Sequence, residues 1–323
     1  MRRRLPTLLL TTCTLLAPAT GGAAPFAYIT NQGSHDVSVV DGDRLTELRR
    51  IPVGRSPAGV VVSRVAGKAF VSSPDGPSVS AIDLADGSVA ERRLPSAVVG
   101  IEASPDGRLL YLADWYRNRL LVLDATSLET RREVAVGHAP AGIVASPDGK
   151  MVFVANRDDN DISVIDTATW RESRRVAVGE HPFALALTPD GHTLLAANVL
   201  SDDVSRVELA TLRESARIPV GSAPYGIAFD ATGERAFVTN QHAASVSVIA
   251  LASGTVSATW EAAEYPEGIA WSPGRVWVVS WMEERLQVLD DRSGKPVGSV
   301  DLGSNPRGFG PFLTHTAPSE TPR

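Results

Sequence analysis

The sequence predicts an all-β protein, a seven-bladed β-propeller with four antiparallel strands per blade. Three observations support this: a repeat of 40 to 42 residues, tight-turn motifs at a fixed place in the repeat, and partial first and last copies. Units of this length that contain only short apolar runs and turns are typical of propeller blades. No 3.6-residue hydrophobic period is sustained, which argues against a helical solenoid.

The second strand of each unit carries the clearest repeat. It is a short apolar stretch that usually ends in Asn, Asp or Ser, as in Phe153-Val-Ala-Asn156. Its large residues recur at intervals of 42, 41, 42, 42, 42 and 40 residues: Tyr28, Phe70, Tyr111, Phe153, Leu195, Phe237 and Trp277. We expect these side chains to pack between blades and the final polar residue to shape the following loop.

The unit at residues 140–178 shows the other elements in order. A first strand at 141–145 leads into the tight turn Asp148-Gly149, where glycine takes the positive φ that the turn needs. The remaining strands are expected at 151–155, 162–165 and 173–178. The third strand ends in an acid in six units, and we expect these acids to accept backbone N–H groups of the next turn: Asp41, Asp83, Asp124, Asp166, Glu208 and Asp290.

The two partial copies predict how the ring closes. The first copy begins at a second strand, near Ala27, and the last stops after a lone first strand, Pro306-Arg-Gly-Phe-Gly310. We expect the C-terminal strand to join the three N-terminal strands in one blade, because closure removes exposed sheet edges. The predicted propeller spans 24–313, and the polar segment 314–323 is expected to be a disordered tail.

The N-terminus predicts export. Arg2, Arg3 and Arg4 precede a short apolar run at 5–16, and small residues with a cleavage position after Ala23 follow. This pattern is typical of a signal peptide, here 1–23, and places the protein in the periplasm or outside the cell. The apolar run is too short for a transmembrane segment.

Cysteine and charge exclude several functions. Cys13, the only cysteine, lies in the predicted signal peptide, so the mature chain would have no disulfide, thiolate metal site, covalent c-type haem or cysteine nucleophile. No cofactor-attachment motif is evident. The net charge of −6 becomes about −9 without the three N-terminal arginines, which argues against nucleic-acid binding.

The second-strand motif resembles that of the YVTN-repeat family of β-propellers. It occurs here as Tyr28-Ile-Thr-Asn31, Phe153-Val-Ala-Asn156 and Phe237-Val-Thr-Asn240. The resemblance covers about 290 residues and implies the propeller fold in an exported protein. Similar propellers include the large subunits of periplasmic amine dehydrogenases, haem d1-binding domains of nitrite reductases and some lactonases. None of these activities follows from the fold alone.

The loops between second and third strands, and those between blades, share one face of a propeller, where we expect a binding site. The loop at 114–119 departs from its sister loops by placing aromatic and cationic residues together. Such residues are common anchors in protein contacts. The candidate residues for a protein partner or small molecule are Trp115, Tyr116, Arg117, Arg119, Tyr225, Trp281 and Arg307.

A metal site is a second candidate on this face. His138 and His181 occupy inter-blade loops of successive units, and Glu180 adjoins His181. Such loops converge near the axis, and imidazole with carboxylate suits Zn or Cu in a site without thiols.

Several functions remain open. Gly-x-Ser-x-Gly, His-Glu-x-x-His, P-loop and Cys-x-x-Cys-His motifs are absent, which favours a non-catalytic protein that binds a partner or small ligand. The alternatives are a periplasmic Zn or Cu handling propeller, an accessory subunit of a quinoprotein or amine dehydrogenase redox system, and a lactonase-like hydrolase.

Overall fold

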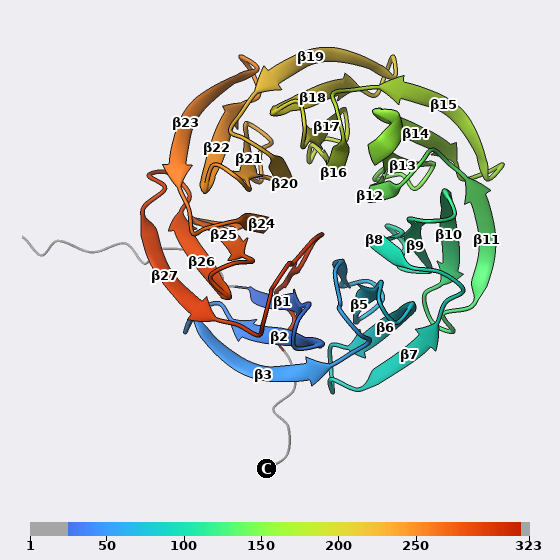
Figure 1. Cartoon of the computed structure of the whole chain (residues 1–323), viewed down its shortest axis with the longest axis horizontal. Helices are drawn as coiled ribbons and strands as arrows, with labels where there is room; N and C mark the ends of the chain where they lie inside the picture. Colours follow the sequence, from blue (N-terminus) through green and yellow to red (C-terminus); the bar gives the residue numbers. More distant parts are fainter. Residues whose placement is uncertain (1–24, 318–323) are drawn as a thin grey trace, which may run out of the picture.

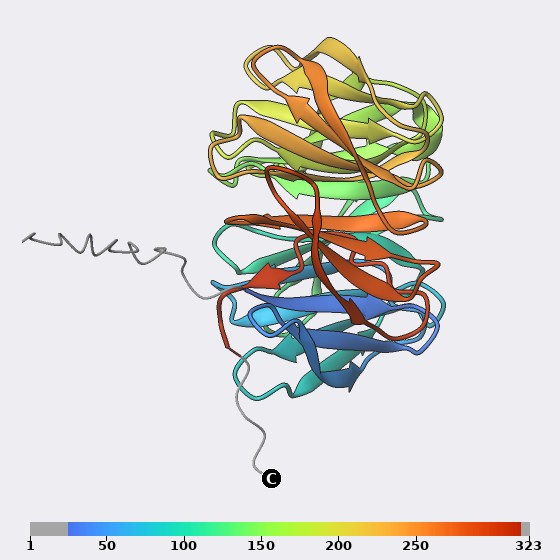
Figure 2. The same cartoon turned by 90° about the vertical axis from the view of Figure 1, so that its left-hand side faces the viewer.

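The seven blades form a closed ring around a central channel (Figure 1). The computed structural model describes residues 25–317. Each blade is a four-stranded antiparallel sheet, and the strands run outward from the axis in chain order in the six blades that are continuous in sequence. Seen from the side, the ring is a disc whose two faces are made of connecting loops (Figure 2). The predicted signal peptide, 1–23, lies outside the described residues.

The strands fall into four concentric sets. The innermost strands are β4 (Val60–Ser63), β8 (Val98–Ala103), β12 (Pro140–Ala145), β16 (Pro182–Leu187), β20 (Pro224–Phe229), β24 (Pro266–Ser272) and β28 (Leu313–Thr314). The second strands are β1 (Phe26–Asn31), β5 (Lys68–Ser73), β9 (Leu109–Asp114), β13 (Met151–Asn156), β17 (Thr193–Asn198), β21 (Arg235–Asn240) and β25 (Arg275–Ser280).

The third strands are β2 (Asp36–Asp41), β6 (Ser78–Asp83), β10 (Arg119–Asp124), β14 (Asp161–Asp166), β18 (Asp203–Glu208), β22 (Ser245–Ala250) and β26 (Arg285–Asp290). The outer strands are β3 (Thr46–Pro52), β7 (Val89–Arg93), β11 (Thr130–Ala135), β15 (Arg171–Ala177), β19 (Arg213–Pro219), β23 (Thr255–Glu261) and β27 (Pro296–Asp301). A short 3₁₀ helix, η1 (Arg157–Asp159), lies between β13 and β14. In the described part of the chain, no helix has the length and hydropathy that a membrane crossing requires.

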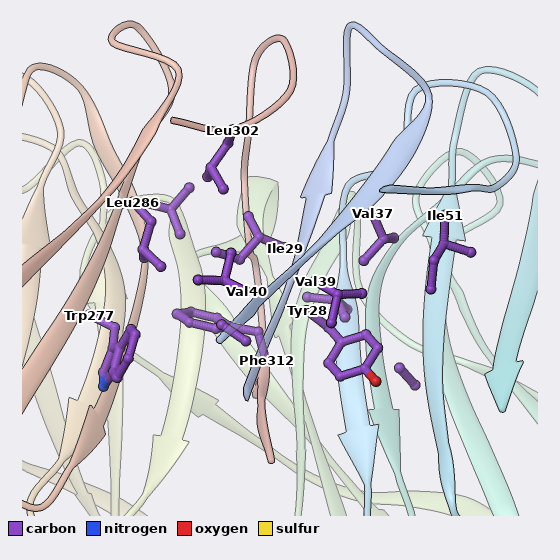
Figure 3. Packing of buried hydrophobic residues seen from close by; sticks show 14 of the residues in the cluster. Tyr28, Ile29, Val37, Val39, Val40, Ile51, Trp277, Leu286, Leu302 and Phe312 are labelled. Carbon is purple, nitrogen blue, oxygen red and sulfur yellow. The ribbon is translucent and has the colours of Figure 1, made fainter. Parts of the chain in front are cut away.

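The core lies between blades, as the repeated large residues of the second strands predict. Tyr28 and Trp277 are fully buried, and both belong to one cluster that spans three neighbouring blades and includes Phe312 (Figure 3). Burial of this apolar surface contributes on the order of 25 cal/mol per Å².

The recurring third-strand acids largely accept hydrogen bonds from the following turn, as the sequence predicts. Asp41, for example, accepts hydrogen bonds from the backbone N–H groups of Asp43 and Arg44.

The ring closes in the blade that joins β28 to β1, β2 and β3. The sequence predicts the last inner strand at 306–310, but the residues paired as a strand are Leu313 and Thr314, opposite Ala27 and Phe26. Pro306 forms only an isolated bridge with Asn31. Between these points the segment bends toward the next blade, where the Val60 N–H donates to the Phe309 carbonyl at 2.8 Å.

Two features explain the shifted strand. Pro306 and Pro311 have no backbone N–H to donate, and Gly308 and Gly310 have φ values of +59° and +119°. The strand also takes in Thr314, which is 1% exposed, although the sequence assigns this residue to a disordered tail. Residues 318–323 of that predicted tail lie outside the described part of the chain.

Candidate functional site

One position of the repeat faces the mouth of the central channel. In five blades it is the second residue of the inner strand, and the residue before it pairs with the last residue of the second strand, as Pro140 pairs with Asn156. In the other two blades the corresponding residues, Ala58 and Arg307, precede β4 and β28. In β8, β12, β20 and β24 the next residue is glycine, and a Cβ on Gly142 would lie 2.3 Å from the carbonyl oxygen of Phe183. Glycine therefore lets adjacent inner strands approach closely around the axis. The seven residues at the mouth are Ala58, Val99, Ala141, Phe183, Tyr225, Glu267 and Arg307.

The mouth is lopsided because these residues differ in size. Three successive blades carry small residues at this position, namely Ala58, Val99 and Ala141. The other four blades carry large or charged residues. A pocket of about 240 Å³ opens over the small side. We call it the mouth pocket, and its lining includes Gln32, Trp115, Tyr116, Phe183, Tyr225 and Arg307.

Aromatic side chains form the wall and the floor of the mouth pocket. The ring centroid of Phe183 lies 4.3 Å from that of Tyr225, 4.8 Å from that of Phe309 and 6.5 Å from that of Trp115. These spacings are those of favourable aromatic pairs. Phe309 does not line the mouth pocket; it packs against Phe183 and Tyr225 and lines a second cavity in the channel, so the aromatic group lies between the two spaces.

Arg307 is the cation of this site. Its Nε donates to Gln32 Oε1 at 3.0 Å, and its Nη1 donates to the Tyr225 hydroxyl at 3.1 Å. Nη1 also lies 3.7 Å from Oε2 of Glu267, a carboxyl group that is 1% exposed and accepts a hydrogen bond from Gln241. The side chain of Arg307 retains 24% exposure, so the guanidinium is held in place and still accessible.

The environment shifts the pKa values of two groups at this site. Burial raises the pKa of Glu267 to about 7, although Arg307 and Gln241 act in the opposite direction. Burial also raises the pKa of Tyr225. Burial therefore shifts the Glu267 carboxyl toward its neutral form, which weakens its compensation of the Arg307 charge.

The structure brings four of the predicted binding residues together. Trp115, Tyr116, Tyr225 and Arg307 all line the mouth pocket. Arg117 is exposed beside them and does not line it.

The other two predicted residues are engaged elsewhere. Arg119 Nε donates to the buried Asp114 carboxylate at 2.7 Å, and Arg119 also pairs with Glu133, so its charge is used within the blade. Trp281 packs against Tyr265, with ring centroids 5.6 Å apart, at a separate place on the same face.

The predicted metal residues are not gathered into a centre. The His138 ring Nδ1 lies 2.7 Å from Asp159 Oδ1, and the backbone N–H of Glu180 donates to Ser201 Oγ. The backbone N–H of His181 donates to Asn160 Oδ1. Among residues 25–317, no three His, Cys, Asp or Glu side chains form a group suited to a metal ion. Each inter-blade loop is instead fixed to the loop beside it.

Phe183, Phe309 and Gln32 belong to the site but are not among the predicted residues. The signal for Phe183 was present, because it follows Pro182 as Tyr225 follows Pro224 and Arg307 follows Pro306. The place of Phe309 depends on the bend in the closing segment, which the repeat pattern does not contain.

Two family models match overlapping parts of the chain. A model described as "Lactonase, 7-bladed beta-propeller" matches residues 24–169, and one described as "YNCE-like beta-propeller" matches residues 144–218. The chain is a seven-bladed β-propeller, and parts of it are similar to the lactonase and YNCE-like propeller families. No curated protein matches this propeller at a significant level.

Solved structures share the fold of this propeller. A functionally unknown protein from Desulfotomaculum acetoxidans is 17% identical with a TM-score of 0.77, covering 91% of this chain and 99% of that one. Kuenenia stuttgartiensis hydrazine synthase is 23% identical with a TM-score of 0.70, covering 77% and 87%. Dihydro-heme d1 dehydrogenase NirN is 18% identical with a TM-score of 0.66, covering 87% and 64%. At these identities the likeness concerns the fold alone.

Proposed function

We propose that this propeller is an exported binding protein that takes a small, flat ligand with an acidic group in the mouth pocket. The proposal depends on one observation: aromatic side chains from several blades and the guanidinium of Arg307 converge on one cavity. Aromatic faces bind flat apolar groups, and a guanidinium binds a carboxylate through paired hydrogen bonds. A mostly apolar pocket with a few fixed polar groups is typical of small-molecule sites.

The charge around Arg307 supports an acidic ligand. Gln32 and Tyr225 hold the guanidinium through neutral hydrogen bonds, and neither group cancels its charge. Glu267 lies behind Arg307, and burial raises its pKa to about 7. An incoming carboxylate therefore meets the positive charge of Arg307, which Glu267 compensates only in part. The other charged group in the lining of the mouth pocket is the exposed carboxylate of Asp75.

Calorimetric titration with indole-3-acetate and with indole tests the proposal. We expect indole-3-acetate to bind more tightly, by about tenfold or more, because only it offers a carboxylate to Arg307. Arg307→Gln should remove this preference. Tyr116→Ala, at a side chain that is 77% exposed, should weaken both probes and leave the fold intact.

The matched control is Arg117→Gln, which removes the same charge from the same face outside the pocket. It should bind both probes as the unaltered protein does. Equal affinity for the two probes, or an equal loss in the Arg117 and Arg307 variants, would refute the assignment of the mouth pocket.

Binding of a protein partner over the same face is the second candidate. Three large apolar side chains are exposed on loops between second and third strands: Tyr116 at 77%, Leu200 at 58% and Met282 at 58%. All three lie on the same face of the disc in separate blades, so a partner that covers this face would contact them. The double variant Leu200→Ser with Met282→Ser tests this role. A partner that binds the unaltered protein but not the double variant would support it, and a partner that binds the two proteins equally would argue against it.

A further inference from the structure

The central channel contains a second cavity beneath the aromatic group, which we call the axial cavity. Its volume is about 370 Å³, and its wall is made of residues from the inner strands. Side chains such as Leu187, Phe229, Trp271 and Leu313 line it, and all four are partly exposed. An apolar surface that is concave and incompletely covered is suited to a hydrocarbon group.

One charged residue interrupts this apolar wall. Glu102 is the only Asp, Glu, Lys, Arg or His among the described residues that line the axial cavity. It lies opposite Tyr111 in the ladder between β8 and β9. The residues opposite the large second-strand side chain of the other blades are all uncharged: Val61, Val144, Ala186, Ala228, Ala270 and Phe312.

Glu102 is not neutralised by the protein. Its Oε1 accepts a hydrogen bond from the backbone N–H of Ala103 at 2.8 Å, and no ion pair involves it in the described part of the chain. The side chain is only partly exposed, and its burial raises its pKa to about 7. A carboxyl group without a cationic partner is costly in such surroundings, so its presence in one blade of seven calls for a function.

We propose that the axial cavity binds a small amphiphilic cation, a protonated amine whose head group meets Glu102 while its hydrocarbon body lies along the apolar wall. A single carboxylate supplies too few ligands for a divalent metal ion. A calcium ion, for example, takes six or more oxygen ligands. An amphiphilic anion would be repelled by Glu102, and a fully apolar molecule would leave the carboxylate unpaired. The mouth pocket and the axial cavity are therefore separate sites for ligands of opposite charge.

Calorimetric titration with n-octylammonium, n-octanoate and octan-1-ol at pH 8 tests this site. These probes have the same hydrocarbon body and differ in charge. We expect n-octylammonium to bind at least about tenfold more tightly than n-octanoate, as one charged hydrogen bond would provide. Absent binding of n-octylammonium, or equal affinity for the two ions, would overturn the proposal.

Two variants locate the ligand. Glu102→Gln keeps the size of the side chain and should lower the affinity for n-octylammonium about tenfold while leaving that for octan-1-ol unchanged. Ala228→Leu narrows the cavity and should weaken the binding of both probes. The matched control, Glu91→Gln, removes an exposed carboxylate from the outer strand β7 and should bind all three probes normally. Unchanged n-octylammonium binding in Glu102→Gln, or retained binding in Ala228→Leu, would contradict the site.

Discussion

At one position of the repeat, the side chains differ in size and charge from blade to blade. Ala141, Phe183, Glu267 and Arg307 occupy one position in four blades, yet they are a buried methyl group, an aromatic wall of the mouth pocket, a buried carboxyl group and a guanidinium. The backbone at this position is nearly the same in each blade, since its neighbour pairs at the end of the second strand. Side-chain chemistry can therefore vary here at little cost to the fold.

Glu102 gives a prediction about stability. Its pKa is raised from 4.5 to about 7, so the folded state keeps a proton that the unfolded state has released. The favourable contribution is complete below about pH 4.5 and is lost as the pH rises through 7. The stability of the unaltered protein relative to Glu102→Gln should fall by at most about 3 kcal/mol across this window.

Urea denaturation of both proteins at pH 4.5, 6 and 8, in buffers free of amines, measures this difference. Glu267 titrates in the same window, but it is present in both proteins and cancels in the comparison. A difference that does not change with pH would contradict the raised pKa of Glu102.

At the scale of elements, buried polar groups link the second, third and outer strands of several blades. Asn156 Nδ2 donates to Asp161 and Ser163, and the Ser163 hydroxyl donates to Glu172. The same arrangement holds β1 to β2 and β3, and β17 to β18 and β19. In β9 and β10 an ion pair takes this place, because Asp114 pairs with Arg119 where these three blades have Asn and Asp.

This exchange predicts a rescue. Asp114→Asn should destabilise the protein by about 2 to 3 kcal/mol, because it removes the fully buried carboxylate that pairs with Arg119. The double variant Asp114→Asn with Arg119→Asp recreates the Asn and Asp pair that three other blades have, and it should recover most of that loss. Urea denaturation of both variants measures the coupling, and a double variant no more stable than the single one would contradict it.

The elements that depend on local sequence were predictable, and those that depend on distant contacts were less so. The second strand expected at 151–155 is Met151–Asn156, since its apolar run and the preceding Asp-Gly turn are local signals. The outer strand expected at 173–178 is Arg171–Ala177, because it is mostly exposed and has little apolar pattern to mark its start.

The same distinction holds for the site. Trp115, Tyr116, Tyr225 and Arg307 could be placed from their loops, and the structure puts all four around the mouth pocket. The pairing of Arg119 with Asp114 could not be foreseen, because the equivalent residues in other blades carry different charges. The position of Phe309 follows from the bend at Gly308 and Gly310, which is set by contacts with β4.

For the whole molecule, closure of the ring depends on the segment that carries β28. Phe312 is fully buried in a cluster with residues of three blades, among them Tyr28 and Trp277 (Figure 3). Its carbonyl accepts a hydrogen bond from the Tyr28 backbone N–H at 2.9 Å. This single side chain therefore joins the first blade of the sequence to the last.

Phe312→Ala should destabilise the protein by about 3 to 5 kcal/mol, the cost of a large cavity in a packed core. Leu48→Ala, at a side chain that is 44% exposed on the outer strand β3, is the control and should change stability by less than about 0.5 kcal/mol. Thermal and urea denaturation measure both, and similar small losses in the two variants would show that the closing blade contributes little.

The pairing of Phe26 with Thr314 also has a topological consequence. Residues opposite each other in an antiparallel ladder are about 5 Å apart, so a linker of a few residues would connect them. A circular permutant opened instead at the Asp148-Gly149 turn would assemble the same circle of sheets, with a different blade shared between its two ends. We therefore expect the closed circle to form whichever blade contains the two chain ends.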